Sequence, residues 1–156
     1  MGLLEELRKV PVSSLELRQV ITARPEDPVS IAVKRMKEAQ LGCVVIVDDQ
    51  GMPLGRFTER LLVRILAYAD PSLDQPISRH MIPTEAMVTP NDPVSRVITL
   101  MRDTGIRFVF VVDEQGKVVA LTGLKGVMKY LADHYPQQIK SQLMEAKLFM
   151  DQREGA

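Results

Sequence analysis

Apolar and polar positions follow the same order in two consecutive stretches of this 156-residue chain. Residues 11–71 align with residues 76–136 at a constant offset of 65, without a gap, and 16 of the 61 aligned positions are identical. The strongest match pairs Arg24–Ser30 with Thr89–Ser95. Because a duplicated unit must bury its apolar face against its neighbour, we expect the two repeats to pack around a pseudo-twofold axis and to leave related clefts between them.

Within each repeat the pattern predicts the order strand, helix, strand, strand, helix. In the first repeat an extended segment, residues 19–23, ends shortly before a proline, which disfavours helix in the residue that precedes it. Asp27 stands before Pro28, so its carboxylate is expected to accept amide hydrogens of the first helical turn. Pro28 would occupy the next position, where the helix needs no amide donor. Apolar residues follow at helical spacing from Val29 to Met36, which predicts a helix with one buried face.

The rest of the repeat predicts a hairpin and a closing helix. Residues 43–47 are an apolar run rich in β-branched side chains, which is typical of a short, fully buried strand. A turn at 48–51, a second strand at 52–57 and a helix whose apolar side includes Leu61 and Ile65 follow. The corresponding features of the second repeat are the extended segment 86–89, Asp92 and Pro93, the helix 94–101, the strands 108–112 and 117–122, the turn 113–116 and a closing helix around Val127 and Leu131.

Both ends of the chain lie outside the two repeats, and each predicts a helix. Within residues 1–10, Leu3 and Leu7 indicate a short N-terminal helix that covers the core or a partner. The C-terminal tail, residues 137–156, predicts an amphipathic helix that packs on the chain itself, joins a second copy or contacts a separate effector protein. Its apolar face consists of Ile139, Leu143, Ala146 and Met150.

Composition and charge narrow the classes of function. Basic and acidic residues number 20 each, so the formal net charge is zero, and we expect no binding to nucleic acid. The opening residues lack the pattern of a secretion signal, and no stretch approaches the roughly 18 apolar residues of a membrane span, so we expect no membrane insertion. The single cysteine, Cys43, lies inside an apolar run, which indicates a small buried residue and suits a reducing cytoplasm.

The sequence offers little for catalysis or for a metal. His80 and His134 are isolated and occupy no shared position in the two repeats, and we therefore expect no metal site. The motifs of a nucleophile elbow, a zinc-binding helix and a phosphate-binding loop are all absent from the sequence. We expect that the protein is not an enzyme and requires no cofactor, because no nucleophile, base and oxyanion donor are grouped.

Several short motifs belong to the repeated pattern. They are Asp-Pro-Val-Ser at 27–30 and 92–95, Gly105–Asp113, Gln115-Gly116 and Gly55–Arg60. Together with the repeated order of elements, they resemble the cystathionine-β-synthase (CBS) domain over roughly residues 11–136. The resemblance implies an α/β fold of two tandem βαββα repeats that meet through their sheets and form a regulatory pair. It also implies association as a homodimer, and two clefts that in many members bind AMP, ADP, ATP or S-adenosylmethionine.

The resemblance further implies which positions would hold such a ligand. The extended segment would supply backbone groups to the adenine, and the start of the buried strand would form the wall of the cleft. The end of the last strand and the start of the closing helix would hold ribose and phosphate. These positions are Ile21, Thr22, Ala23, Gly42, Cys43, Val44, Thr58, Glu59 and Arg60 in the first repeat, and Met87, Val88, Arg107, Phe108, Val109, Thr122, Gly123 and Lys125 in the second.

The ribose position departs from the family pattern, which has Thr or Ser, two residues and then Asp. In the first repeat Thr58 is present, but Leu61 occupies the Asp position. In the second repeat Gly123 occupies the Thr position, with Thr122 one place early, and Gly126 occupies the Asp position. A buried sugar hydroxyl that lacks its partner costs about 1 to 3 kcal/mol, which corresponds to a tenfold to hundredfold loss of affinity.

Cations offer a different way to hold a nucleotide. Arg60 and Lys125 are one repeat apart, each near the predicted start of a closing helix, where a cation and free amide groups together would hold a phosphate. The alternative is that both belong to a solvated helix face. Arg107 also has two interpretations: its side chain contacts a ligand phosphate, or it extends to the protein surface.

Two hypotheses about function follow. The first is a regulatory module that senses an adenosine-type nucleotide and signals to a partner through conformation or association. The second is an interaction scaffold whose clefts have lost their ligand, and which acts through its dimer and its C-terminal helix. Leu61 and Gly126, at the two Asp positions, motivate the second hypothesis.

Overall fold

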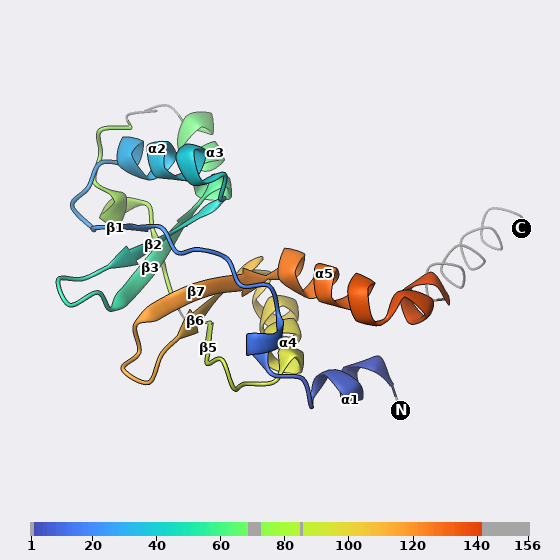
Figure 1. The fold of residues 1–156 in the computed structure, drawn as a ribbon. Helices are drawn as coiled ribbons and strands as arrows, with labels where there is room; N and C mark the ends of the chain where they lie inside the picture. Colours follow the sequence, from blue (N-terminus) through green and yellow to red (C-terminus); the bar gives the residue numbers. More distant parts are fainter. Residues whose placement is uncertain (1, 69–72, 85, 142–156) are drawn as a thin grey trace, which may run out of the picture.

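Two small β-sheets, one for each repeat, form the centre of the computed structural model, which describes residues 2–68, 73–84 and 86–141 (Figure 1). The strands are β1 (Thr22–Ala23), β2 (Cys43–Val47), β3 (Pro53–Thr58), β4 (Ile82–Pro83), β5 (Met87–Val88), β6 (Phe108–Val112) and β7 (Val118–Gly123). The first sheet has the order β1-β2-β3-β4, and the second has the order β5-β6-β7. In both sheets the opening strand runs parallel to the buried strand, and the hairpin is antiparallel.

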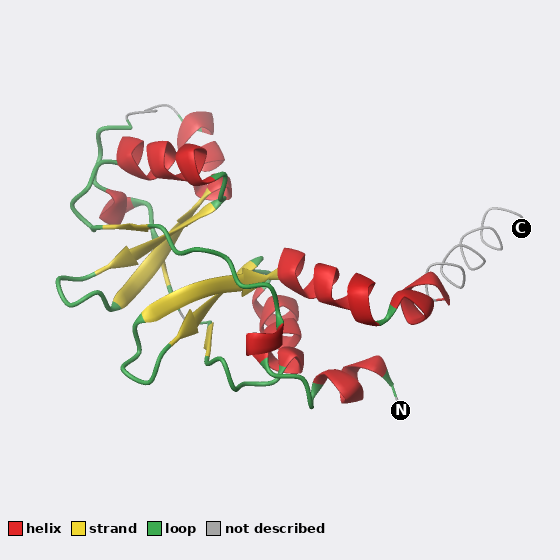
Figure 2. Ribbon diagram, in the orientation of Figure 1, coloured by secondary structure: helices red, strands yellow, loops and turns green. Residues whose placement is uncertain are grey.

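Helices pack on each sheet, so the fold is the expected mixed α/β arrangement (Figure 2). The helices are α1 (Leu3–Leu7), α2 (Val29–Ala39), α3 (Glu59–Ala67), α4 (Val94–Thr104) and α5 (Leu124–His134), with 3-10 turns η1 (Val12–Ser14) and η2 (Ile77–Arg79). The predicted order of elements is confirmed in both repeats. None of the described helices combines the length with the apolar composition that a membrane span requires. The chain is also helical at 136–141, and the rest of the expected C-terminal helix lies outside the described residues.

The predicted helix caps are wrong. Helices α2 and α4 begin at Val29 and Val94, and their N-caps are prolines without a side-chain hydrogen bond. The Asp27 carboxylate instead accepts a hydrogen bond from the amide of Arg24 (2.9 Å), and Asp92 accepts the equivalent bond from the amide of Thr89 (2.7 Å). The proline that follows each aspartate is extended and separates it from the helix. Both aspartates therefore stabilise the loop before the helix.

The opening segments of the two sequence repeats are exchanged between the two cores. The amide of Val12 donates to the carbonyl of Asp92 (2.8 Å), and the side chain of Val12 is fully buried in the core of the second repeat. In the same way, the amide of Ile77 donates to the carbonyl of Asp27 (2.9 Å), and Ile77 is fully buried in the core of the first repeat. Strand β4, which follows η2, also joins the first sheet. Each core is therefore completed by residues that the alignment assigns to the other repeat.

A third apolar cluster joins the two sheets, and we call it the seam. It consists of Leu41, Cys43, Val45, Phe110 and Leu121, with partly buried neighbours that include Val20, Met87 and Phe108. Cys43 is fully buried there, as the sequence predicts. Since strands of both repeats contribute, the seam holds the two halves together through apolar burial.

Candidate functional site

The first repeat brings its predicted site residues together at the ends of its strands. The pairing of β2 with β3 places Cys43 opposite Thr58, so the start of the buried strand lies beside the end of the last strand. On the other side of β2, the amide of Val45 donates to the carbonyl of Ile21 (2.9 Å), and Thr22 pairs with Val45. We call the junction of Gly42 and Cys43 with Thr58, Glu59 and Arg60 the first rim.

Glu59 places a carboxylate at the first rim. Its amide donates to the carbonyl of Gly42 (3.2 Å), and a Cβ atom on Gly42 would lie only 3.0 Å from Cδ and Oε2 of Glu59. Glycine at position 42 therefore lets this side chain lie directly against the backbone. Glu59 is the first residue of α3, where the helix dipole favours a negative charge. At the expected Asp position, in contrast, Leu61 is only 7% exposed and packs in the core of the first repeat.

The second repeat forms an equivalent junction, the second rim, from Arg107, Phe108, Gly123, Leu124 and Lys125. Strand pairing places Phe108 opposite Gly123, and the amide of Leu124 donates to the carbonyl of Arg107 (3.2 Å). Gly123 has φ +154°, and a Cβ atom there would lie 1.9 Å from that same carbonyl oxygen. The backbone at this position therefore leaves no room for the threonine of the family pattern.

Atoms also pack closely around Gly126, which follows the second rim in the sequence. A Cβ atom on Gly126, at the expected Asp position, would lie 3.2 Å from Oγ1 of Thr122 and 3.3 Å from the carbonyl oxygen of Glu16. Thr122 is 3% exposed, and its hydroxyl is buried without a hydrogen-bond partner. It pairs with Val109, a residue of the second core, whereas Gly123 alternates to the opposite face of the strand.

Burial divides the predicted site residues into three groups. Ala23, Cys43, Val44, Val88, Val109, Thr122 and Gly123 are buried; Ile21, Gly42, Thr58, Met87 and Phe108 are partly buried; Thr22, Glu59, Arg60, Arg107 and Lys125 are exposed. The side chains available to a ligand in solution are therefore mainly the charged ones. The first rim combines Glu59 with Arg60, whereas the second rim combines Arg107 with Lys125 and includes no acid.

The rims hold no reactive thiol. Burial raises the pKa of the Cys43 thiol from its ordinary value of 9.0 to about 12, against a smaller opposing effect of the nearby Arg56 charge. The thiolate is therefore negligible at neutral pH. Among the described residues, no group of three or more His, Cys, Asp or Glu side chains is placed to hold a metal ion.

Arg56 is a feature of the seam that the sequence analysis missed. Its side chain is only 6% exposed, and its Nη1 donates to the carbonyl of Phe108 (3.1 Å) in the other repeat. The guanidinium carbon lies 5.8 Å from the centre of the Phe110 ring, within range of a cation–π interaction. The repeat carries a sequence signal for it, because the aligned residue of the second repeat is Leu121. A charge at an apolar strand position indicates a specific buried contact.

Comparisons with known proteins agree with this architecture. The family model described as the CBS domain matches residues 12–68 and again residues 77–133. An uncharacterised protein of Methanopyrus kandleri (strain AV19) is 32% identical over 139 residues, which cover 86% of this chain and 70% of that protein.

Two solved structures extend the comparison to three dimensions. The CBS domain pair of protein MJ0100, in complex with 5-methylthioadenosine and S-adenosyl-L-methionine, has a TM-score of 0.71 and 22% identity, and the match covers 80% of this chain and 97% of that one. The CBS domain protein PAE2072 from Pyrobaculum aerophilum, complexed with AMP, has a TM-score of 0.71 and 20% identity, with 87% and 99% covered. The chain therefore belongs to the CBS domain family and carries two CBS domains in tandem.

Proposed function

We propose that this protein is a regulatory module that binds an adenosine-type nucleotide beside the seam and signals to a partner through a change in conformation or association. The observation that carries the proposal is the convergence of predicted ligand positions at two equivalent rims. The complexes of related CBS pairs with AMP, 5-methylthioadenosine and S-adenosyl-L-methionine support the choice of ligand class. The buried thiol of Cys43 fits a reducing compartment, and we place the protein in the cytoplasm.

Of the two rims, the second suits a phosphate better. Arg107 and Lys125 are both exposed there, and the amide end of α5, a helix of 11 residues, begins at Leu124. A phosphate gains from both the cations and the free amides of a helix start. At the first rim, the Glu59 carboxylate would repel the same group. We therefore assign the phosphate of AMP to the second rim.

Isothermal titration calorimetry with AMP, ADP, ATP and S-adenosylmethionine tests this proposal. Arg107→Ala and Lys125→Ala should each weaken AMP binding about tenfold, because each removes a charge-assisted hydrogen bond of about 1.5 kcal/mol. Lys117→Ala is the matched control, since Lys117 is an exposed lysine at the opposite end of the β6–β7 hairpin, away from the second rim. Adenosine, which lacks the phosphate, should bind weakly and equally to all variants. An absence of heat with every ligand at millimolar concentration would reject nucleotide sensing.

One observation favours the alternative function of an interaction scaffold. Val63 on α3 and Met128 on α5 occupy aligned positions and are 64% and 52% exposed, so both closing helices present an apolar side chain to solvent. A homodimer formed through these helices would cover them. Under this alternative, light scattering should show a dimer that Val63→Asp together with Met128→Asp converts to a monomer. A dimer that persists in this variant would exclude α3 and α5 as its contact.

A further inference from the structure

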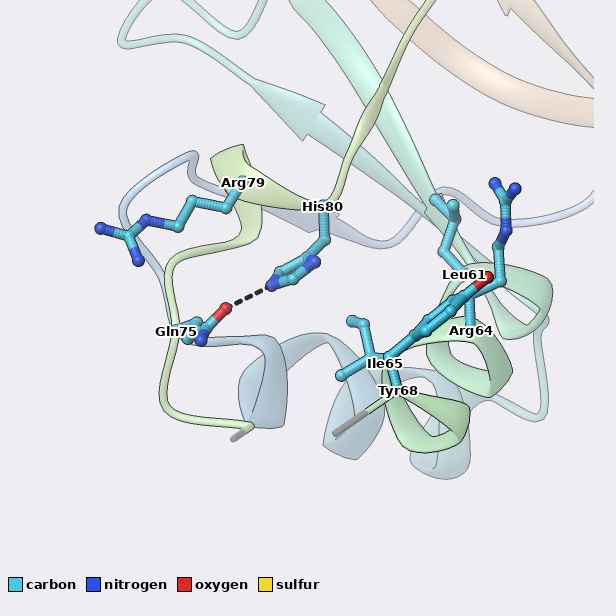
Figure 3. A pocket seen from close by; sticks show the side chains of 7 residues that line it. All are labelled: Leu61, Arg64, Ile65, Tyr68, Gln75, Arg79 and His80. Carbon is cyan, nitrogen blue, oxygen red and sulfur yellow. Dashed lines mark hydrogen bonds between the residues drawn. The ribbon is translucent and has the colours of Figure 1, made fainter. Parts of the chain in front are cut away.

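Two pockets lie at equivalent places beside the closing helices. The α3 pocket, of about 400 Å³, lies between α3 and the residues around η2 (Figure 3). The α5 pocket, of about 250 Å³, lies between α5 and the residues around η1. The offset of 65 relates their linings, because it aligns Arg64 with Lys129 and Tyr68 with Asp133. The exchanged opening segments supply one wall of each pocket, and none of the predicted ligand positions lines either one.

The two pockets differ in charge. In the α5 pocket, Nζ of Lys129 is neutralised by carboxylate oxygens of Glu16 (3.1 Å) and Asp133 (3.2 Å). Tyr68 of the α3 pocket aligns with Asp133, and Met81, which directly follows the pocket residue His80, aligns with Glu16. The α3 pocket therefore lacks both of the acids that neutralise the lysine of the α5 pocket.

The α3 pocket instead carries two exposed arginines. Arg64 on α3 and Arg79 on η2 stand on opposite sides of the opening (Figure 3). Neither forms an ion pair with a carboxylate in the described part of the chain. Their guanidinium groups extend toward solvent, and both side chains are long enough to turn over the opening. The opening of the α3 pocket is therefore positively charged.

The interior of the α3 pocket is largely apolar and is closed on one side by a fixed imidazole. Leu61 and Ile65 are nearly buried and form the α3 wall, along which the Tyr68 ring lies (Figure 3). His80 faces this wall, and its Nε2 lies 2.7 Å from Oε1 of Gln75, which fixes the orientation of its ring. A flat apolar group between the imidazole and the Tyr68 ring would contact aromatic surface on both sides.

We propose that the α3 pocket is a separate binding site for a small anion attached to an aromatic ring, such as an aryl phosphate or aryl carboxylate. The volume lies within the range of pockets that bind small molecules. The ring would be held by Tyr68, Ile65 and His80, and the anionic group by the fork-shaped donors of Arg64 and Arg79. The α5 pocket does not bind the same ligand, because Glu16 and Asp133 satisfy its lysine.

Phenyl phosphate is the probe for the test, and its binding is measured by calorimetry and by the NMR signals of the tyrosine rings. Arg64→Ala and Arg79→Ala should each weaken binding at least fivefold, and Tyr68→Ala should weaken it while the affinity for inorganic phosphate stays low. Lys129→Ala is the matched control in the α5 pocket and should leave the affinity unchanged. None of the four substituted residues belongs to the apolar clusters of the two cores or the seam, and circular dichroism checks that each variant folds.

Three outcomes would overturn the proposal. Inorganic phosphate that binds as tightly as phenyl phosphate would show that the apolar walls play no part. A loss of binding in Lys129→Ala that matches the loss in Arg64→Ala would show nonspecific attraction to surface cations. A loss in Arg107→Ala or Lys125→Ala would place the probe at the second rim. Since AMP titrations report on the rims and phenyl phosphate on the α3 pocket, either proposal can fail without the other.

Discussion

At the scale of single residues, Gly123 shows why one repeat departs from the family pattern. Gly105, which follows α4 in the same repeat, has φ +69° and no atom within 4 Å of an added Cβ. Gly123 has φ +154° and a backbone oxygen at 1.9 Å. Gly105 therefore needs glycine only for its backbone conformation, whereas Gly123 needs it also for space.

This difference predicts unequal costs for the same substitution. Gly105→Ala should lower the free energy of unfolding by about 1 kcal/mol, the usual cost of a side chain in the left-handed region. Gly123→Ala should lower it by more than about 3 kcal/mol, because the carbonyl of Arg107 must move and the β6–β7 pairing with it. Urea denaturation of both variants measures the two costs. Equal losses of unfolding free energy would show that the carbonyl of Arg107 moves away from the added Cβ atom without a cost.

At the scale of elements, the exchange of opening segments decides which residues share a core. Ile77 belongs by sequence to the second repeat, yet it packs in the same cluster as Val29 of the first repeat. Val94 belongs to the same sequence repeat as Ile77 but lies in the other core. Residues in one cluster are energetically coupled, whereas distant residues contribute independently.

Double-mutant cycles test this exchange. Ile77→Ala should lower the free energy of unfolding by about 2 to 4 kcal/mol. Combined with Val29→Ala, its effect should be non-additive by at least about 0.5 kcal/mol, and combined with Val94→Ala it should be additive. Urea denaturation of the single and double variants gives both coupling energies. Coupling to Val94 in place of Val29 would contradict the exchange.

The elements themselves could be predicted from the sequence where the local pattern decides the outcome. The strands at 43–47 and 108–112 have the expected bounds, since a short apolar run rich in β-branched residues between turn residues has few other solutions. The exchange could not be predicted, because an alignment shows that two segments are alike and not which core each one joins. The caps were mispredicted because Pro28 takes the N-cap position that local rules give to Asp27.

The candidate site was predictable to a similar degree. The rims bring together the positions that the resemblance implies, because the strand register aligns Cys43 with Thr58 and Phe108 with Gly123. The burial of Thr122 and the close approach at Gly123 depend on atoms far along the chain, which a local motif does not specify. The α3 pocket arises from the exchanged segment, so no sequence pattern indicated it.

At the scale of the whole molecule, the two repeats are joined by an apolar seam, and Arg56 is the one charged residue buried beside it within the described part of the chain. Arg56 contributes to it through the carbonyl of Phe108 and the ring of Phe110, both from the other repeat. A guanidinium suits this place because it donates in a fixed plane and stacks on an aromatic face, which an ammonium does not do equally well. Arg56 therefore fixes the start of β6, and with it the second rim, relative to the first repeat.

This arrangement predicts a graded response to substitution of Arg56. Arg56→Leu copies the aligned residue of the second repeat but leaves the buried carbonyl of Phe108 without this donor, so the free energy of unfolding should fall by about 2 kcal/mol. Arg56→Lys retains the charge and a donor but loses the planar stack, and it should lose about half as much. Arg102→Ala, at an exposed arginine away from the seam, should stay within about 0.5 kcal/mol of the wild type. Chemical denaturation measures the free energy of unfolding of all three variants. An unchanged free energy of unfolding in Arg56→Leu would mean that apolar burial alone joins the repeats. The second rim would then be positioned without a polar contact across the seam.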